Sequence, residues 1–239
     1  MAILESTTMP DTRRCFALVP CAGVGARAGA GGPKQYAPLG AQAVVAHTLD
    51  ALAQMPQLAA TLVVLAPDDR DFEIHAPRFA GERAWVARCG GATRAASVAA
   101  GLSALRDRGA HSDDWVLVHD AARCLLRPEW VTRLIDACFN DTVGGLLALP
   151  LADTLKDALD DRVARTLSRN GKWLAQTPQM FPLGLLERAL QEAGDGVTDE
   201  SSAIEALGLH PRLVPGELEN LKLTWPADFA LAARLLETR

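Results

Sequence analysis

The sequence predicts an α/β fold in which helices flank a mostly parallel β-sheet. Short apolar runs, typical of buried strands, alternate with longer segments whose apolar residues recur every three or four positions. The chain has 239 residues, of which 49% are hydrophobic and 22% charged, enough apolar material for one core. Alternation of strand and helix along one chain is the pattern of a parallel sheet with crossover helices.

The first 150 residues supply most of the predicted sheet. Predicted strands occupy residues 15–20, 60–67, 84–89, 115–120 and 143–150. Predicted helices occupy residues 43–55, 93–109 and 127–139, where the helical period is clearest. Because each helix separates two strands, we expect the helices to cross over the sheet.

The pattern changes near residue 151. Two weakly alternating runs, 153–159 and 162–168, flank the polar pair Asp160–Asp161, which predicts a β-hairpin arm at about 151–172 that leaves the main sheet. An arm that is half apolar cannot bury itself alone, so we expect it to pack on a partner subunit in a homodimer. Beyond the arm we expect helices at 183–194 and 197–208, a strand at 220–224 and a closing helix from Pro226.

Composition excludes several classes of protein. The formal net charge of −5 argues against a broad phosphate-neutralising surface, so no nucleic acid is expected as a partner. No apolar stretch approaches the roughly 20 residues that span a bilayer, and the first residues lack a signal core, which predicts a cytoplasmic protein.

We expect residues 1–14 to form a disordered tail and residues 15–239 one domain. The five cysteines are scattered without a C-x-x-C pair, so no metal ligands or disulfides are predicted.

A glycine-rich loop follows the first predicted strand, with the sequence CAGVGARAGAGGPKQY over residues 21–36. Its first glycines fit the G-x-G-x-x-G/A dinucleotide fingerprint, but the later glycines and Pro33 break the helix that this fingerprint needs. A Walker A loop is also excluded, because Gln35 follows Lys34. The loop is suited to wrapping a polyanion, with backbone N–H groups turned inward and Arg27 and Lys34 adding full charges. A mobile surface loop with two solvated cations remains the alternative.

Further motifs follow this loop in a fixed order: PKQY, HDAAR, SRNG, TPQ, TDE and LKLT. Together with the glycine-rich loop they resemble the signatures of the 2-C-methyl-D-erythritol 4-phosphate cytidylyltransferases, over residues 15 to about 236. The resemblance implies a Rossmann-like sheet of the nucleotide-diphospho-sugar transferase type. It also implies transfer of a cytidylyl group from CTP to 2-C-methyl-D-erythritol 4-phosphate, giving 4-diphosphocytidyl-2-C-methyl-D-erythritol and pyrophosphate in non-mevalonate isoprenoid biosynthesis. Mg²⁺ is implied as a cofactor that bridges the CTP phosphates.

The resemblance also implies roles for particular residues. Arg27 and Lys34 match transition-state stabilisers, and Arg169 and Lys222 match residues that position the phosphorylated alcohol, with Arg169 reaching the site from the partner's arm. The residues expected at the nucleotide are Cys21, Ala22, Gly23, Gly25, Gly91, Ser97 and Asp120. Those expected at the second substrate are Asp120, Arg123, Thr154, Arg169, Thr177, Thr198 and Lys222. Ala92, Thr93 and Cys124 depart from the residues usual in the family.

Several of these residues also have a purely structural explanation. Asp120 follows an apolar strand and would cap the next turn, and Thr93 is a suitable N-cap for the helix after it. Thr177 and Thr198 stand where we expect helix or turn starts, and a surface salt bridge would account for Arg169. Lys222 lies in the expected strand at 220–224, where an unpaired lysine is costly, and this favours a functional role for it. Two other functions stay open: a cytidylyltransferase for another polyol phosphate such as ribitol 5-phosphate, and a non-catalytic nucleotide-binding or dimerisation module. A dehydrogenase is the more distant alternative.

Overall fold

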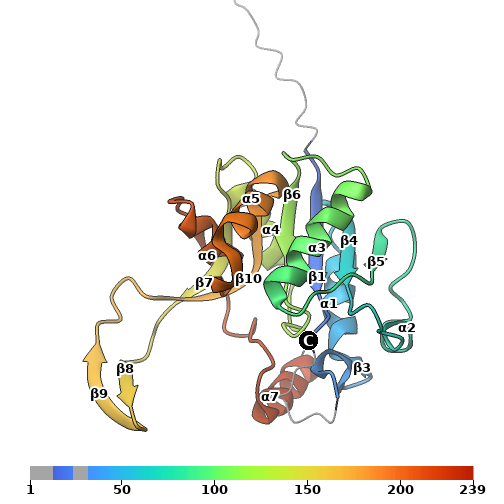
Figure 1. Cartoon of the computed structure of the whole chain (residues 1–239). Helices are drawn as coiled ribbons and strands as arrows, with labels where there is room; N and C mark the ends of the chain where they lie inside the picture. The colour runs from blue at the N-terminus through green and yellow to red at the C-terminus, as the bar shows by residue number, and fades with distance from the viewer. Residues whose placement is uncertain (1–12, 24–31, 239) are drawn as a thin grey trace, which may run out of the picture.

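A seven-stranded sheet in the order β11-β7-β10-β6-β1-β4-β5 forms the centre of the molecule. The computed structural model describes residues 13–23 and 32–238 (Figure 1). The strands are β1 (Cys15–Pro20), β4 (Leu58–Val64), β5 (Ala84–Ala87), β6 (Trp115–Val118), β7 (Gly145–Pro150), β10 (Trp173–Pro182) and β11 (Arg212–Pro215). β1 pairs in parallel with β4 and β6, as do β4 with β5 and β7 with β11. The predicted mostly parallel α/β sheet is thus confirmed.

Helices cover both faces of this sheet. They are α1 (Val44–Ala53), α2 (Phe72–His75), α3 (Arg94–Asp107), α4 (Pro128–Cys138), α5 (Leu183–Ala193), α6 (Glu200–Ala206) and α7 (Pro226–Glu237). Buried side chains of α1 and α4 belong to one core layer, and those of α3, α5 and α6 to the other. A smaller cluster packs α7 against residues that follow β6. In the described part of the chain, no helix has the length and apolar character needed to cross a bilayer.

The burial of β1 on both faces explains why the central strands are unbroken apolar runs in the sequence. Cys15, Ala17 and Val19 face the layer of α1 and α4, whereas Phe16 and Leu18 face the layer of α3. All five are at most 3% exposed. A strand covered by helices on both faces has no solvent side, so its sequence does not alternate.

β10 runs antiparallel to both of its neighbours in the sheet. It pairs with β6 on one side and with β7 on the other, and its register against β7 shifts between Ala175 and Gln179. The sequence patterns predicted neither β10 nor β11. β10 lies directly after the arm, so its chain enters the sheet from the arm and runs against the parallel strands.

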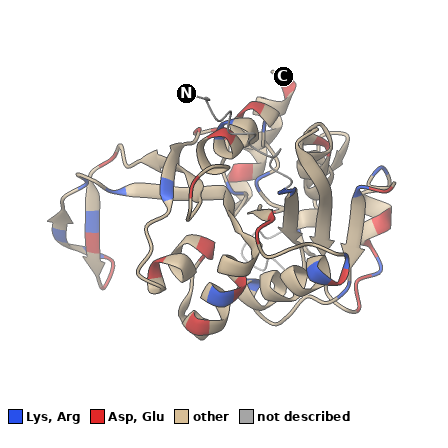
Figure 2. Cartoon of the chain, turned by 90° about the horizontal axis from the view of Figure 1, so that it is seen from above, with Lys and Arg blue, Asp and Glu red and all other residues tan. Residues whose placement is uncertain are grey.

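The arm is a two-stranded hairpin of β8 (Leu155–Leu159) and β9 (Arg162–Leu167), which confirms the predicted hairpin. Its two-residue turn consists of Asp160 and Asp161, with φ of 49° and 59°. Positive φ at both central positions is what a type I′ turn requires, and aspartate tolerates it better than most residues. The hairpin projects away from the sheet (Figure 1). The hairpin carries both basic and acidic residues (Figure 2), and Arg165 Nε lies 2.9 Å from Asp157 Oδ2 across its two strands.

The predicted strand at 220–224 is wrong. Residues 220–224 form an extended segment that joins no strand ladder of the described chain. Buried Asn220 ties its start to β10 by donating to the Thr177 carbonyl, and the N–H of Leu223 donates to the carbonyl of Ala122, 2.9 Å away. These contacts hold the segment across the end of β6 instead of alongside a strand. The expected tail falls largely on residues 1–12, which lie outside the described residues.

Candidate active site

A cavity of about 410 Å³ opens where the chain leaves β1, β5 and β6. Its walls come from residues 20–23, 34–35, 91–94 with Ser97, 120–122 and Lys222. Carboxyl ends of parallel strands are the usual place for ligands in open α/β sheets. The cavity gathers these residues expected at the site: Cys21, Ala22, Gly23, Lys34, Gly91, Ser97, Asp120 and Lys222. Arg27 and Gly25 lie outside the described residues.

Gln35 holds the start of the glycine-rich loop. Its Nε2 donates to the carbonyls of Cys21, at 3.1 Å, and Gly23, at 2.9 Å. The preceding residue, Lys34, donates from Nζ to the Leu223 carbonyl at 2.8 Å and so reaches across to the segment of Lys222. A short 3-10 turn, η2 (Lys34–Tyr36), carries both side chains. This turn therefore fixes one wall of the cavity.

The opposite wall is the loop before α3. Thr93 is the N-cap of α3, as predicted, and accepts from the N–H of Ala96 at 3.0 Å. Ser97 accepts from the N–H of Gly91 at 3.1 Å and donates to the Thr93 carbonyl at 3.0 Å, so its hydroxyl folds the loop back onto the helix. A Cβ on Gly90 would come within 2.3 Å of the Ala22 Cβ, which shows how closely this loop approaches the chain after β1.

Asp120 lies at the centre of a group of charges. Its Oδ1 accepts from Arg94 Nε at 2.9 Å, and its Oδ2 lies 2.8 Å from Lys222 Nζ. Arg123 approaches the same oxygen at 3.6 Å. Burial alone would raise the pKa of Asp120, but the charges of Arg94 and Lys222 outweigh it and hold the pKa well below its usual range. Asp120 is therefore an ionised hydrogen-bond acceptor at neutral pH.

Arg94 joins this carboxylate to a second one, Glu200. The guanidinium nitrogens Nη1 and Nη2 donate to Glu200 Oε1 and Oε2 at 2.6 and 3.0 Å, and Glu200 is 1% exposed. Burial raises the pKa of Glu200, and Arg94 opposes the rise. The sequence patterns did not single out either residue. The available signal was a basic residue at the first position of α3, where the helix dipole disfavours it unless a carboxylate is near.

A series of hydrogen bonds through Thr177 and His119 holds the backbone at Asp120 in place. The N–H of Asp120 donates to Thr177 Oγ1 at 3.0 Å, and that hydroxyl lies 3.1 Å from His119 Nδ1. His119 Nε2 lies 3.2 Å from the Arg123 carbonyl. Burial lowers the pKa of His119 from 6.5 to about 4, so the ring is neutral at neutral pH. A proton on Nε2 satisfies all three contacts, with the Thr177 hydroxyl donating to Nδ1.

Comparison with known proteins gives the family. The family model described as 2-C-methyl-D-erythritol 4-phosphate cytidylyltransferase matches residues 15–238. The chain belongs to this family. It is a nucleotidyltransferase, and the α/β nucleotidyltransferase fold and the resemblance stated from the motifs are confirmed.

Relatives and solved structures support this assignment. A relative from Laribacter hongkongensis that carries the family's name is 57% identical and covers 93% of this chain and 96% of its own. A bifunctional enzyme IspD/IspF from Albidiferax ferrireducens is 60% identical over 99% of this chain, which spans 56% of that relative. The crystal structure of a 4-diphosphocytidyl-2C-methyl-D-erythritol synthase is similar with a TM-score of 0.83 and 42% identity, over 94% of this chain and 98% of the other. The family's enzyme from Thermus thermophilus gives a TM-score of 0.77 at 32% identity, covering 94% of this chain and 99% of the other.

Several residues expected from the family lie outside the cavity. Thr177 stands within β10 and not at the start of a helix or turn, and its hydroxyl accepts from the N–H of Asp120, which follows β6. Thr198 borders a smaller neighbouring cavity of about 190 Å³ together with Arg94 and Glu200. Asp199, and not Thr198, is the N-cap of α6, accepting from the N–H of Ser202 at 2.9 Å.

Arg123 and the arm residues Thr154 and Arg169 are the other expected residues that lie outside the cavity. Arg123 packs behind Asp120 and donates to the carbonyls of Asn220, at 2.6 Å, and Ala175, at 3.3 Å. Thr154 lies where the arm begins, and Arg169 lies where it ends and donates to the Ala152 carbonyl. Neither arm residue lines the cavity of its own chain.

Lys222 is not in a strand, so the expected penalty for a lysine within an apolar strand does not arise. Its side chain is 40% exposed and meets Asp120 at the cavity. Lys222 therefore still belongs to the candidate site, but because it pairs with Asp120 and not because of a costly place within a strand. A cation that pairs with a buried carboxylate while half exposed remains accessible to an anionic ligand.

Proposed function

We propose that the protein transfers the cytidylyl group of CTP to 2-C-methyl-D-erythritol 4-phosphate at the cavity beside β1 and β6, releasing pyrophosphate. The observation that carries this proposal is the convergence of Lys34, Lys222 and Arg94 on one cavity that contains a single lining carboxylate among the described residues. Such a cavity is suited to two polyanions. The family assignment supports CTP and the methylerythritol phosphate over ribitol 5-phosphate as the pair of substrates.

The reaction joins two anions, so charge compensation is its main requirement. An oxygen of the methylerythritol phosphate attacks the α-phosphorus of CTP, a P–O bond forms there, and the bond to the leaving pyrophosphate breaks. Fixed cations stabilise the charge of the transition state, and positioning supplies much of the remaining acceleration. We assign Lys34, together with Arg27 of the glycine-rich loop, to the triphosphate. Lys222 and Arg169 are assigned to the attacking phosphate.

The remaining residues are assigned by their place around the cavity. The loop of Gly91 and Ser97 and the chain of Cys21 to Gly23 present backbone groups that suit the base and sugar of the nucleotide. Asp120, with Arg123 behind it, would accept from donor groups of either substrate. Thr154, Thr177 and Thr198 are proposed at the methylerythritol phosphate, with Thr177 acting through the position of Asp120.

Mg²⁺ fits this site as an ion carried mainly by the nucleotide. Among the described residues there is no cluster of three or more metal-ligating side chains, and Asp120 is the cavity's one carboxylate. Both oxygens of Asp120 already meet cations. We therefore propose that CTP phosphate oxygens supply most of the ligands, with Asp120 reaching the ion through water. The ion would neutralise phosphate charge.

We also propose a homodimer in which each arm completes the partner's site. Two-stranded hairpins are marginally stable alone, and this one leaves Leu159 69% and Val163 64% exposed. Arg169 has no place at the cavity of its own chain, which supports delivery to a second one. The net charge of −5 supports a protein without nucleic-acid partners. We place its activity in the cytoplasm, where nucleoside triphosphates are available.

Pyrophosphate release tests the function. We expect release only when CTP, Mg²⁺ and 2-C-methyl-D-erythritol 4-phosphate are all present, with a product whose mass is that of 4-diphosphocytidyl-2-C-methyl-D-erythritol. Equal turnover of ribitol 5-phosphate would refute the assignment of the alcohol. For the arm, mixing inactive Arg27→Ala and Arg169→Ala subunits is expected to restore activity, because one site of each heterodimer is intact. Absence of rescue would show that the arm serves its own chain.

A further inference from the structure

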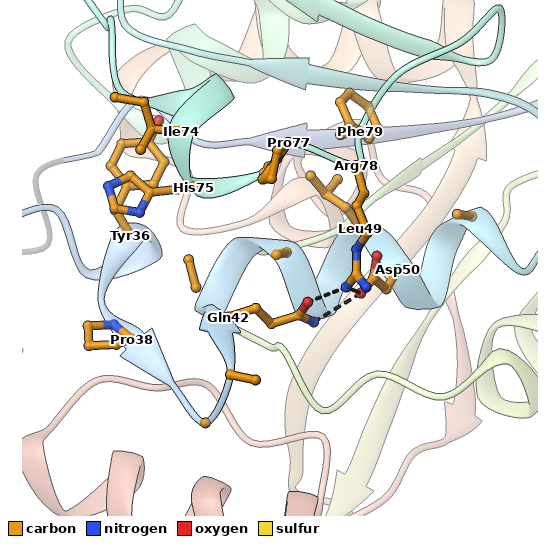
Figure 3. Close-up of a pocket in the computed structure, with 16 residues that line it drawn as sticks. Tyr36, Pro38, Gln42, Leu49, Asp50, Ile74, His75, Pro77, Arg78 and Phe79 are labelled. Atoms are coloured by element: carbon orange, nitrogen blue, oxygen red, sulfur yellow. Dashed lines mark hydrogen bonds and ion pairs between the residues drawn. The ribbon is translucent and has the colours of Figure 1, made fainter.

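A second cavity of about 680 Å³ lies apart from the site described above (Figure 3). It is bounded by the short hairpin of β2 (Pro38–Leu39) and β3 (Gln42–Ala43), by α1, and by the chain from Ile74 to Phe79. Of the residues expected to bind nucleotide or alcohol, none that the structure describes lines it. Its volume lies within the range of small-molecule sites.

The middle of this cavity is apolar. Leu49 of α1 and Pro77 and Phe79 of the facing segment border it, and Ile74 stands at its edge (Figure 3). Ile74 is 72% exposed, which leaves a large aliphatic side chain in water beside an apolar hollow. A ligand that filled the hollow would cover this surface and gain its hydrophobic free energy.

One end of the cavity is polar but carries no net charge. Asp50 Oδ2 accepts from Gln42 Nε2 at 2.9 Å and from Arg78, so the one acid and the one guanidinium among the described lining residues neutralise each other. Both hydrogen bonds use Oδ2, which leaves Oδ1 as an acceptor for a ligand. A charged ligand would have to break this pair, whereas an uncharged ligand with one N–H or O–H group would add to it.

The other end is formed by Tyr36, which is stacked on His75 at 4.8 Å with 9° between the rings. The Tyr36 hydroxyl donates to Asp69 Oδ2 at 2.5 Å. Tyr36 belongs to the turn η2, whose other residues, Lys34 and Gln35, line the nucleotide cavity. The three consecutive residues of η2 thus supply walls to two cavities: Lys34 and Gln35 line the nucleotide cavity, and Tyr36 lines the second one. A ligand that orders the segment of His75 would therefore hold Tyr36 and η2, and through η2 also Lys34, in place.

We propose that this cavity is a second ligand site, which takes a small uncharged aromatic molecule with one hydrogen-bond donor and is coupled to the nucleotide cavity through η2. The ring lies against Leu49, Pro77 and Phe79, and its donor meets Asp50. The segment of Pro77 and Phe79 also carries His75, so a ligand that orders this segment acts on η2 through the stack of His75 on Tyr36. The coupling rests on the proposed function, in that the first cavity holds CTP. Because coupling is reciprocal, the ligand that tightens CTP binding is itself bound more tightly in the presence of CTP.

Indole is the probe that tests the site, since it is flat, uncharged and has one N–H group. Titration of the ¹⁵N-labelled protein is expected to give saturable shifts of the Leu49, Ile74 and Phe79 amides, with a Kd of about 1 mM or tighter for a ligand of this size. 1-Methylindole, which keeps the shape and lacks the donor, should bind about fivefold more weakly. Equal affinity of the two probes would overturn the assignment of Asp50.

Two blocking variants and a control separate this site from surface binding. Ala41→Trp and Ala53→Trp place a bulky ring at exposed alanines that line the cavity, and each should abolish the shifts. Ala99→Trp places the same ring at an exposed position of α3 away from both cavities and should leave binding unchanged. Shifts that survive both blocking variants, or an absence of saturable shifts in the wild type, would overturn the site.

The coupling is measured by calorimetric titration of CTP with and without saturating indole. We expect indole to lower the Kd of CTP about fivefold, at the low end of measured couplings, and Ala53→Trp to remove the effect. An unchanged Kd would overturn the coupling. Because indole binding is observed without turnover, a protein that binds indole at this site but not CTP supports the second site and speaks only against the proposed function.

Discussion

Replacement of Arg94 by methionine separates the stability of the site from its chemistry. The guanidinium joins the two buried carboxylates Asp120 and Glu200. After Arg94→Met, Asp120 keeps Lys222 and Arg123, but Glu200 loses the one cation with which the structure pairs it. The consequences for the two carboxylates therefore differ.

The magnitude follows from the burial of Glu200, which is 1% exposed. Removal of one partner of a buried pair costs about 3 to 5 kcal/mol, and we expect about 3, because Glu200 can bind a proton. Glu200 already has a raised pKa, and loss of Arg94 raises it further. The folded variant then binds more protons than the unfolded chain above the ordinary pKa of glutamate, so its free energy of unfolding should rise as the pH falls toward that value.

Urea unfolding and pyrophosphate release are the two assays. The double variant Arg94→Met, Glu200→Gln removes the unpaired charge and should recover most of the lost stability, while kcat/KM for the methylerythritol phosphate stays at least about tenfold below the wild type because Asp120 is no longer held by Arg94. The matched control is Arg106→Met, which breaks a half-exposed pair with Glu187 at 2.7 Å and should cost under about 1 kcal/mol. Recovery of kcat/KM together with stability in the double variant would refute the idea that Arg94 positions Asp120.

Three further predictions concern other parts of the molecule. Lys34→Ala should lower kcat by about 100- to 1000-fold at nearly unchanged stability, and a normal kcat in the pyrophosphate assay would remove Lys34 from the chemistry. Because the pKa of His119 is lowered from 6.5 to about 4, the unfolded chain binds more protons in that window, so stability is full above pH 6.5 and is lost as the pH falls toward 4. His119→Gln should lack this loss, about 1.4 kcal/mol per pH unit in urea titrations, and an identical pH profile would contradict the assignment. Asp161→Val should disrupt the arm turn, where φ is 59°, and shift the proposed dimer toward monomer in sedimentation, whereas Asp161→Gly should not.

Strands that consist of one continuous apolar run could be predicted from the sequence. β1 and β6 are buried on both faces, so their sequences mark them without help from neighbours. β10 could not be predicted in this way, because its first three residues are exposed while its remainder is almost entirely buried, and the change occurs within one strand. The segment at 220–224 has strand-like composition, but its hydrogen bonds go to Ala122 and to β10, and only the tertiary structure shows those partners.

The site was predictable as a set of motifs but not as a network. Lys34, Asp120 and Lys222 are far apart in the sequence, and the resemblance of their motifs to those of the family placed them at one site, where the structure brings them to one cavity. Arg94 and Glu200 are separated by 106 residues, and neither has a local pattern that demands the other. Pairing of this kind depends on how α3 and α6 pack, a property that no short stretch of sequence contains.

The network gives a reason for the position of Asp120 at the end of β6. A lone carboxylate in this cavity would repel the phosphates of both substrates, yet three cations surround it and leave the group with net positive charge even when Glu200 is counted. Asp120 thus holds Arg94, Arg123 and Lys222 close together against their mutual repulsion. Substitution of Asp120 by asparagine should therefore disperse these cations before it removes any contact with substrate, and the first measurable effect should be a higher KM for the methylerythritol phosphate. If kcat fell while that KM stayed constant, Asp120 would instead act on the reacting groups themselves.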